Sequence, residues 1–387
     1  MELDLSWVLW AVPLAFAAGW VASRFDLRQW RMESRSAPKS YFKGLNHLLN
    51  EQQDQAIDAF IAAVQQDPDT AELHFALGNL FRRRGDYDRA VRVHEHLLHR
   101  ADLSQTDRER AQHALAMDFM RAGLLDRAEA CLQQLKGTPH ETEANLTLLG
   151  LYERTREWAK AIAIAQALGT GRQGSFTHRI AHYHCELAQE VLNGQAVDKA
   201  RAHLIQALTL APDSARAHLD LARLLTHAGQ ANQAFDQLVA LAHHAPKALP
   251  LAAQPLVDLA LTLQRIPEAQ QLLTEAERHA PSVDHVEALA RLLRADQSAE
   301  KSALFLDHLT RESSLVVASG WLGLNVSHSP PMPSAVPDVI RKAVSNAAVP
   351  LRRYRCAACG FEAGTHFWQC PGCQTWDSYS PRRVDEL

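Results

Sequence analysis

The sequence has almost no excess of charge of either sign and few β-branched residues. These two shortages narrow the range of functions and of secondary structures that the protein can have. Over 387 residues the formal net charge is −4, which gives no sign of a globally basic protein that binds nucleic acid. Leucine, alanine, glutamine, arginine and histidine dominate instead, a composition that favours helices over sheets. The hydrophobic fraction of 47% excludes wholesale disorder, and the length predicts two or three domains or one long repeat array.

The sequence also lacks the motifs of common catalytic centres. It has no glycine-rich phosphate loop, no G-x-S-x-G elbow and no H-E-x-x-H helix, and we therefore expect no enzyme activity. Two stretches rich in histidine bring no further ligand at a fixed spacing, and we predict no metal at either: His94, His96 and His99, and His182, His184 and Cys185. Cys131 and Cys185 lie in helical stretches and are expected to pack as small hydrophobic side chains.

One apolar run, Leu5 to Ser23, contains no charged residue. Its nineteen residues would span about 28 Å as a helix, close to the hydrocarbon thickness of a bilayer. Trp7 and Trp20 lie near its ends, where aromatic side chains meet the membrane surface. Residues 1–23 are therefore predicted to form a transmembrane anchor, followed by a basic juxtamembrane linker at residues 24–36.

The charges on either side of this run predict its orientation. Two acidic residues, Glu2 and Asp4, precede it, and five basic residues follow it closely: Arg24, Arg28, Arg31, Arg35 and Lys39. Positive flanks stay on the cytoplasmic side, so we expect a single-pass protein with a periplasmic N-terminus and a cytoplasmic body. The alternatives are a cleaved signal peptide, which would need a basic start, and a buried soluble helix. In the cytoplasm, clustered cysteines indicate metal ligands rather than disulfides.

A repeat of 34 residues runs through the middle of the chain. The stretch LGNLFRRRGDYDRAVRVHEHLL, which begins at Leu77, has small residues at Gly78 and Ala90 and an aromatic residue at Phe81. The preceding stretch shows the same frame from Gly44, one full period earlier. Weaker frames continue the pattern of small and large apolar residues: Ala116 and Phe119, Leu149 and Tyr152, Ala188 and Leu204, Ala222 and Leu225, and Ala260 and Leu273.

This pattern resembles the tetratricopeptide repeat and predicts an all-α fold. Small residues let paired helices approach, large residues fill the space between pairs, and each unit buries its face only against its neighbours. We expect a curved solenoid over residues 37–324, with a degenerate last unit after Asp284. Such an array offers a concave binding surface rather than chemistry. Asn79, Arg82 and Arg83 lie on the first helix of the second unit, where they face either this groove or solvent.

Cysteine is scarce, and four of the six cysteines lie close together near the C-terminus. Cys356, Cys359, Cys370 and Cys373 form two C-x2-C knuckles separated by ten residues, a pattern that brings four sulfurs around one metal ion. A segment this short cannot bury enough surface to fold alone, and metal ligation supplies roughly 10–16 kcal/mol at such sites. Disulfides and free thiols are the alternatives. Four sulfur ligands with no open position predict a structural or electron-transfer site, for which Zn and Fe are both suitable.

The residues around the knuckles complete a small domain. Aromatic side chains are expected to cover the metal cluster: Tyr354, Phe361, Phe367, Trp368 and Trp376. Upstream, the composition shifts to SHSPPMPSAVP and then to DVIRKAVSNAA. We therefore predict a linker with one short helix at residues 325–350 and a metal-binding domain at residues 351–387.

Together, the three parts resemble the lipopolysaccharide assembly protein B family of Gram-negative bacteria. The most specific matches are GNLFRRRGDYDRA at Gly78–Ala90, AHYHCELA at Ala181–Ala188 and the cysteine knuckles within Arg353–Cys373. The resemblance implies that the tail is a rubredoxin-like domain packed against the tetratricopeptide array. It also implies one ion on the four cysteines, with iron favoured over zinc.

The resemblance further implies an inner-membrane adaptor that regulates lipopolysaccharide biosynthesis. Such an adaptor would promote proteolysis of the committed-step UDP-3-O-acyl-N-acetylglucosamine deacetylase of the lipid A pathway by a membrane AAA protease. Other lipopolysaccharide assembly proteins are further expected partners. The physiological metal, the groove residues that bind partners and the oligomeric state, a homodimer included, stay open.

Two other classes of function compete with the adaptor. One is a rubredoxin-type electron-transfer protein on a repeat scaffold. The other is a zinc ribbon that binds nucleic acid through Arg352, Arg353 and Arg355, with the salt dependence typical of such binding. The predicted membrane anchor argues against the second class, and we expect no nucleic-acid partner.

Overall fold

The computed structural model describes residues 13–20, 39–169, 176–294, 296–325 and 335–387. Most of the predicted anchor and all of the predicted basic linker at 24–36 lie outside these residues, as do residues 326–334 of the predicted second linker. Residues 13–20 are helical and exposed. Within the described ranges, no helix is both long enough and apolar enough to cross a membrane.

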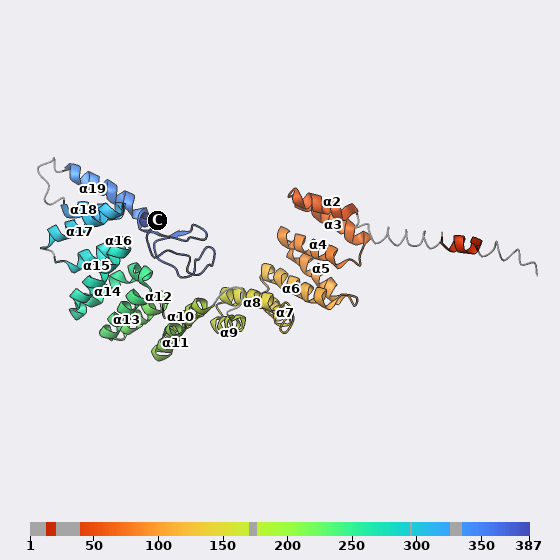
Figure 1. The fold of residues 1–387 in the computed structure, drawn as a ribbon, viewed down its shortest axis with the longest axis horizontal. Helices are drawn as coiled ribbons and strands as arrows, with labels where there is room; N and C mark the ends of the chain where they lie inside the picture. The colour runs from red at the N-terminus through yellow and green to blue at the C-terminus, as the bar shows by residue number, and fades with distance from the viewer. Residues whose placement is uncertain (1–12, 21–38, 170–175, 295, 326–334) are drawn as a thin grey trace, which may run out of the picture. The chain divides into compact units, whose positions relative to one another are not determined.

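The chain divides into two compact units, residues 1–155 and 156–387. Unit 1 is built of helices that pack on their neighbours in chain order (Figure 1). Its described helices beyond residue 38 are α2 (Lys39–Leu49), α3 (Gln53–Gln66), α4 (Ala71–Arg84), α5 (Tyr87–His99), α6 (Gln105–Ala122), α7 (Leu125–Gln133) and α8 (Glu141–Thr155).

Small residues allow the close pairing of helices in unit 1, as the repeat frame predicts. Gly78 of α4 faces His94 of α5 so closely that a Cβ there would lie 2.5 Å from the ring Cε1. Gly85 ends α4 at a positive φ of 86°, a conformation that costs glycine little. The large frame residues Phe81 and Phe119 are buried. The helical repeat is therefore confirmed in this unit.

Unit 2 continues the paired helices and carries the cysteine-rich tail. Its helices are α9 (Trp158–Leu168), α10 (Thr177–Asn193), α11 (Val197–Leu210), α12 (Ala215–His227), α13 (Ala231–His244), α14 (Leu249–Leu263), α15 (Ile266–His279), α16 (Val283–Leu292), α17 (Ser298–Arg311), α18 (Leu315–Asn325) and α19 (Ala335–Ala348). Short 3-10 helices lie at η1 (Pro246–Ala248), η3 (Val349–Arg352) and η4 (Val384–Glu386).

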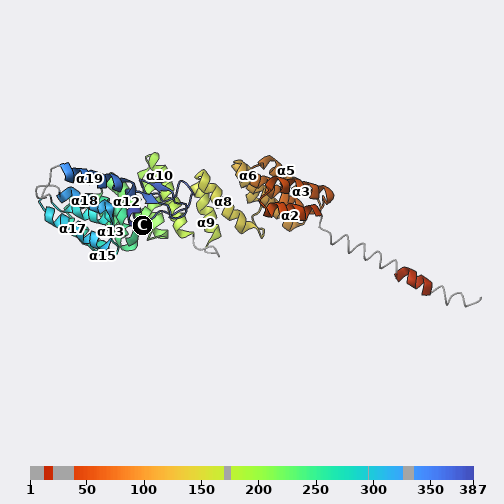
Figure 2. The same ribbon diagram turned by 90° about the horizontal axis from the view of Figure 1, so that it is seen from above.

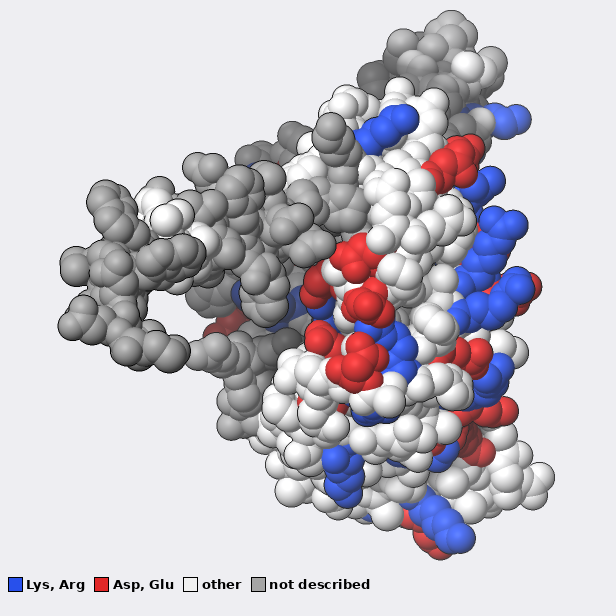
Figure 3. Space-filling model, turned by 90° about the vertical axis from the view of Figure 1, so that its right-hand side faces the viewer, with Lys and Arg blue, Asp and Glu red and all other residues white. Residues whose placement is uncertain are grey.

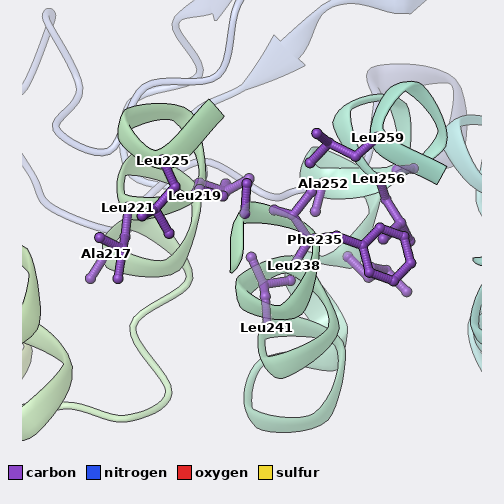
Figure 4. Packing of buried hydrophobic residues seen from close by; sticks show 14 of the residues in the cluster. Ala217, Leu219, Leu221, Leu225, Phe235, Leu238, Leu241, Ala252, Leu256 and Leu259 are labelled. Atoms are coloured by element: carbon purple, nitrogen blue, oxygen red, sulfur yellow. The ribbon is translucent and has the colours of Figure 1, made fainter. Parts of the chain in front are cut away.

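One apolar core runs through α10 to α16 of unit 2. Leu219 of α12, Leu238 of α13 and Leu256 of α14 are buried in it, together with Phe235 (Figure 4). The degenerate region after Asp284 has a second core of its own, which α16, α17, α18 and the end of α19 share. The last helices therefore still pack as an array although the repeat frame has faded.

The cysteine-rich tail, residues 353–387, is called the ribbon below. It contains two short antiparallel strands, β1 (Tyr354–Arg355) and β2 (Glu362–Ala363), paired as Tyr354↔Ala363 and Arg355↔Glu362. The ribbon lies on the inner side of the curve that the helices of unit 2 form (Figures 1 and 2). Its own core includes Leu251 of α14, so its interior is continuous with the array.

Candidate metal centre and its docking on the array

The two cysteine knuckles have the same backbone design. In the first, the N–H of Cys356 donates to Phe361 O at 2.9 Å and the N–H of Gly360 donates to Cys356 O at 2.9 Å. In the second, Cys370 N–H donates to Thr375 O at 3.0 Å and Gln374 N–H donates to Cys370 O at 2.8 Å. Gly360 and Gln374 occupy equivalent positions and both have positive φ, 78° and 60°. Each C-x2-C spacing therefore closes one tight hairpin.

These hairpins bring the four predicted ligands together. The sulfurs of Cys356, Cys359, Cys370 and Cys373 all lie within 4.8 Å of one another. The Sγ–Sγ distances are 3.8 Å for Cys356–Cys373 and 3.7 Å for Cys359–Cys370, which suit tetrahedral ligation at sulfur–metal bonds of about 2.3 Å. Gly372 packs against the cluster, because a Cβ there would lie 3.6 Å from the Cys359 sulfur. The donor set and spacing fit one thiophilic ion.

The surroundings of the sulfurs favour negative charge on some and oppose it on others. A hydrogen bond between Cys356 and the Ser378 hydroxyl, helped by backbone N–H groups, lowers the pKa of Cys356 to about 6. Hydrogen bonds from Thr375 lower the pKa of Cys373. The N–H of Phe361 favours the Cys359 thiolate, but desolvation and the neighbouring cysteines outweigh it and raise its pKa to about 12. Four thiols this close resist joint ionisation, and a bound cation would remove that resistance.

The aromatic residues of the ribbon do not all cover the cysteines, which corrects the expectation from the sequence. Tyr354 does pack in the ribbon core with Cys356 and Cys370, but Phe361 is 45% exposed. The core instead includes Tyr379, which the sequence prediction missed. His366 packs at its edge, where burial lowers the pKa of the imidazole to about 4 and keeps it neutral.

Trp368 and Trp376, also expected over the cluster, contact the array. Trp368 packs against the apolar core of unit 2. The ring of Trp376 stacks on His182 of α10, with centroids 4.8 Å apart and an angle of 22°. It also meets Trp158 of α9 and Tyr183 of α10 edge-on. These tryptophans dock the ribbon rather than shield its cysteines.

A charged hydrogen bond accompanies this aromatic contact. The Nε2 of His182 lies 2.9 Å from both carboxylate oxygens of Asp377, so an N–H there donates to the carboxylate. Burial opposes ionisation of Asp377, but the hydrogen bond and charge of His182 outweigh it and lower its pKa. His182 therefore binds the ribbon.

The end of the chain forms a second contact, called the clasp below and defined by Arg383, Asp385 and Glu386. Arg383 makes a bidentate pair with Asp284 of α16, with N–O distances of 2.8 and 2.9 Å. The carboxylate of Glu386 accepts hydrogen bonds from the N–H of Val283 and from that of Arg383 itself. Burial raises the pKa of Glu386 despite these donors. The clasp holds the C-terminus to the start of α16.

Asp385 completes the clasp at a different helix. Its carboxylate accepts hydrogen bonds from the hydroxyl of Ser314 and from the N–H groups of Leu315 and Val316. These groups belong to the first turn of α18, where helical N–H groups have no partner within the helix. A negative charge there also interacts favourably with the helix dipole. A residue 70 positions away in the sequence thus caps α18.

The other residues considered from the sequence have ordinary structural roles. His94 is buried and bonded to Asp118 at 2.5 Å. Cys185 is buried in the core of unit 2 and Cys131 is half-buried; burial raises the pKa of both thiols. In the part of the chain that the structure describes, the ribbon cysteines are the single group of three or more suitably placed metal ligands.

The arginines before the first knuckle are engaged with carboxylates. Arg352 pairs with Glu287 at 2.7 Å, and Arg355 pairs with Glu362 at 2.7 Å. Arg353 lies 3.9 Å from the same Glu362. These two carboxylates offset part of the positive charge of the three arginines.

Comparison with known proteins agrees with this architecture along the whole chain. Lipopolysaccharide assembly protein B of Escherichia coli strain K12 is 31% identical over 386 residues, which cover 98% of this chain and 98% of that protein. The protein of the same name from Haemophilus influenzae is 30% identical over 383 residues, 96% of each chain. The chain belongs to the lipopolysaccharide assembly protein B family. The resemblance inferred from the sequence is thereby confirmed.

Models of individual domains match the same parts of this family member. The rubredoxin metal binding domain matches residues 354–381, and the tetratricopeptide repeat matches residues 73–109 and 185–250. The clasp lies beyond the matched domain, which ends two residues before Arg383. Among solved structures, a tetratricopeptide repeat protein from Parabacteroides merdae matches with a TM-score of 0.34 and 16% identity, covering 66% of this chain and 100% of its own.

Proposed function

We propose that the chain is a membrane-anchored adaptor that controls lipopolysaccharide synthesis. The observation that carries this proposal is the match to lipopolysaccharide assembly protein B over 98% of both chains. An array of paired helices supplies binding surface rather than reacting groups, which supports a role without catalysis. As its client we propose the lipid A pathway deacetylase, handed to a membrane AAA protease, with other lipopolysaccharide assembly proteins as further partners.

The proposed location is the bacterial inner membrane, with residues 1–23 as the anchor and the body in the cytoplasm. The uncharged run from Leu5 to Ser23 and the basic residues after it support this orientation. Anchoring matters for an adaptor because tethering raises the effective concentration of a bound client beside a membrane protease, to the mM range for short flexible linkers.

The proposed ligands of one metal ion are Cys356, Cys359, Cys370 and Cys373, with iron favoured and zinc the alternative. When bound, the ion joins the two knuckles and so stabilises a ribbon too small to fold by apolar burial alone. Elemental analysis of protein purified from its native host, together with visible absorption from iron–thiolate bonds, distinguishes the two metals. Less than half an ion per chain would contradict the site.

Two truncations in the native host test the adaptor function. Deleting Met1–Ser23 should leave a folded, metal-containing protein that fails to lower the level of the deacetylase at normal expression. Removing residues 351–387, which include the whole ribbon, should also abolish regulation, while the array keeps its helical circular dichroism. Replacing Leu5–Ser23 by an unrelated transmembrane helix is the matched control and should preserve regulation. Normal deacetylase levels in both truncated strains, measured by immunoblot, would refute the adaptor function.

Electron transfer is a second candidate, favoured by one observation. Cys359 and Cys373 are exposed while Cys356 and Cys370 are buried, so one side of the sulfur cluster is open to a redox partner. If this function holds, purified protein in which zinc replaces the native iron should fail to restore deacetylase turnover to membranes that lack the native protein. A zinc-loaded protein that still supports deacetylase turnover would exclude it.

A further inference from the structure

Unit 1 contains a groove that the metal centre and its docking do not use. Its volume is about 740 Å³, and it lies between the repeats formed by α2 to α6. The buried side chains of Phe60 and Leu80 form part of its apolar floor. Its polar lining includes Asn79, Arg82, Arg83 and Arg121. Of the ten residues that line it within the described chain, three are arginines and none is acidic.

A buried carboxylate, that of Asp118, holds Arg82 in place. Its Nη1 donates to Asp118 at 2.8 Å and to the carbonyl of Ala114 at 3.0 Å. Asp118 is fully buried and its other oxygen lies 2.5 Å from His94 Nδ1. Asn79 accepts a further hydrogen bond from Arg82. Arg82 is therefore held mainly by contacts within the fold and is less available to a ligand than an unpaired arginine would be.

The other two arginines are not used by the fold. Arg83 of α4 and Arg121 of α6 are exposed, and neither has a hydrogen-bond or ion-pair partner among the residues described. Nearby arginines behave differently: Arg84 pairs with Asp54 at 2.8 Å and Arg127 pairs with Glu95 at 3.1 Å. Figure 3 shows Lys and Arg side chains in a run along the right-hand edge of the face it presents, with Asp or Glu side chains beside only some of them. The groove therefore combines two guanidinium groups without a partner in the described chain with an apolar lining, which makes it a candidate binding site.

We propose that this groove binds an acidic peptide segment of a partner protein, with Arg83 and Arg121 recognising its carboxylates. Guanidinium groups bind carboxylates through paired, charge-assisted hydrogen bonds. The apolar floor would take a large hydrophobic side chain between the acidic residues, an arrangement in which pockets give specificity and charges give register. The proposal rests on the proposed adaptor function and names the chemistry of a client or partner that the array would hold.

A peptide fits the groove better than a membrane surface does. Phe60 and Leu80 are buried whereas Arg83 and Arg121 are exposed, so a flat layer of lipid headgroups would meet the guanidinium groups without reaching the apolar lining. A peptide chain is narrow enough to enter and contact both. An anionic membrane is therefore the competing occupant, and the experiment must separate the two.

The test uses the full-length protein in detergent and an array of random peptides of about fifteen residues. Bound peptides should be enriched in Asp and Glu over the array as a whole. The tightest peptide is then labelled, and its affinity is measured by fluorescence anisotropy beside a copy with Gln and Asn in place of Glu and Asp. We expect the neutral copy to bind at least about tenfold more weakly, since charge-assisted contacts are lost, and the acidic peptide to weaken as salt is raised.

The double variant Arg83→Gln/Arg121→Gln should weaken the acidic peptide by at least about tenfold, and Arg121→Gln alone by less. Arg89→Gln/Arg92→Gln is the matched control: both are exposed arginines of α5 outside the groove lining, and affinity should be unchanged. Circular dichroism and thermal melting check that all variants fold. The same proteins are mixed with vesicles containing anionic phospholipid.

Three results would overturn the proposal: equal binding of acidic and neutral peptides, equal loss in the groove and control variants, or a loss confined to vesicle binding. Because these measurements need neither the protease nor the deacetylase, they can fail while regulation in cells persists. Conversely, peptide binding can hold even if the proposed regulatory role does not.

Discussion

Replacing Arg383 by methionine should release the clasp and increase opening of the ribbon from the array. The guanidinium pairs with both oxygens of Asp284 at 2.8 and 2.9 Å and also donates to the carbonyl of Arg352 at 2.8 Å. The side chain of Asp284 is only 5% exposed and that of Arg383 is 21% exposed. The guanidinium carbon also lies 4.3 Å from the centroid of the Tyr354 ring, so methionine, which keeps a flexible apolar side chain, removes the charge, these hydrogen bonds and this ring contact together.

The expected cost follows from the burial of the partner left behind. Removing one member of a buried pair costs about 3–5 kcal/mol because the other charge stays buried without compensation. Since Arg383 is one-fifth exposed, the lower figure of about 3 kcal/mol applies, and it corresponds to a roughly 150-fold larger open population. The N–H of Val283, which donates to Glu386 of the clasp at 2.9 Å, reports this opening directly.

Native-state hydrogen exchange followed by mass spectrometry measures the effect. Peptides from the start of α16 should exchange much faster in Arg383→Met, while metal content stays at the level of the unmodified protein. Arg355→Met is the control, because its pair with Glu362 is 46% and 32% exposed and should contribute no more than about 1 kcal/mol. Exchange at α16 that differs by less than about fivefold between the two variants would show that the clasp does not hold the ribbon.

Three further changes probe the array and the metal centre. Gly78→Ala should destabilise the protein by about 1–3 kcal/mol, because its new methyl group would lie 2.5 Å from a buried ring; Gly150→Ala, with nothing within 4 Å, should be neutral or stabilise by about 0.5–1 kcal/mol in urea unfolding. Cys370→Ser should lose the metal and make the ribbon sensitive to protease, whereas Cys131→Ser should keep both the metal and the resistance; full metal content in the first variant would contradict the four-cysteine site. Burial lowers the pKa of His285, so below about pH 6.5 the imidazole takes up a proton in the unfolded chain but not in the folded one. Lowering the pH from 7.5 to 5.5 should therefore reduce the free energy of unfolding by up to about 1.4 kcal/mol. Melting curves of His285→Leu should show a smaller acid loss; an unchanged pH dependence would mean that His285 takes up its proton in the folded state.

The sequence predicts the repeats and the knuckles well because both depend on short spacing. The small and large residues of the repeat frame, such as Gly78 and Phe81, all lie within one helix pair. Each C-x2-C closes a hairpin through hydrogen bonds between residues a few positions apart. Local patterns of this kind carry their own geometry. Even where the frame is weak, after Asp284, α16 and α17 still form because the apolar periodicity is maintained in them.

The family resemblance implies that the tail packs against the array, but the contacts that dock the ribbon could not be read from the sequence. His182 and Asp377 are 195 positions apart, and Arg383 and Asp284 are 99 apart. Tryptophans beside a cysteine cluster are equally able to cover the metal or to bind a neighbouring surface, and only the tertiary structure decides between these roles. The stretch AHYHCELA, which contains His182, was a signal of the family but gave no indication of its partner.

The docking contacts and the metal ligands meet in one short turn of the ribbon. Cys373 Sγ lies 3.3 Å from the hydroxyl of Thr375, within hydrogen-bond distance, and Trp376 and Asp377, which bind α10, follow directly. Gln374 and Asp377 both have positive φ, 60° and 51°, a conformation that non-glycine residues keep only when their surroundings hold it. An ion on Cys373 would hold this turn from inside the ribbon, and His182 holds it from the array. Because both contacts stabilise the same backbone, each should favour the other, and by linkage the coupling must be equal in both directions. The ribbon is therefore better understood as a part of the array that metal completes than as a separate domain attached to it.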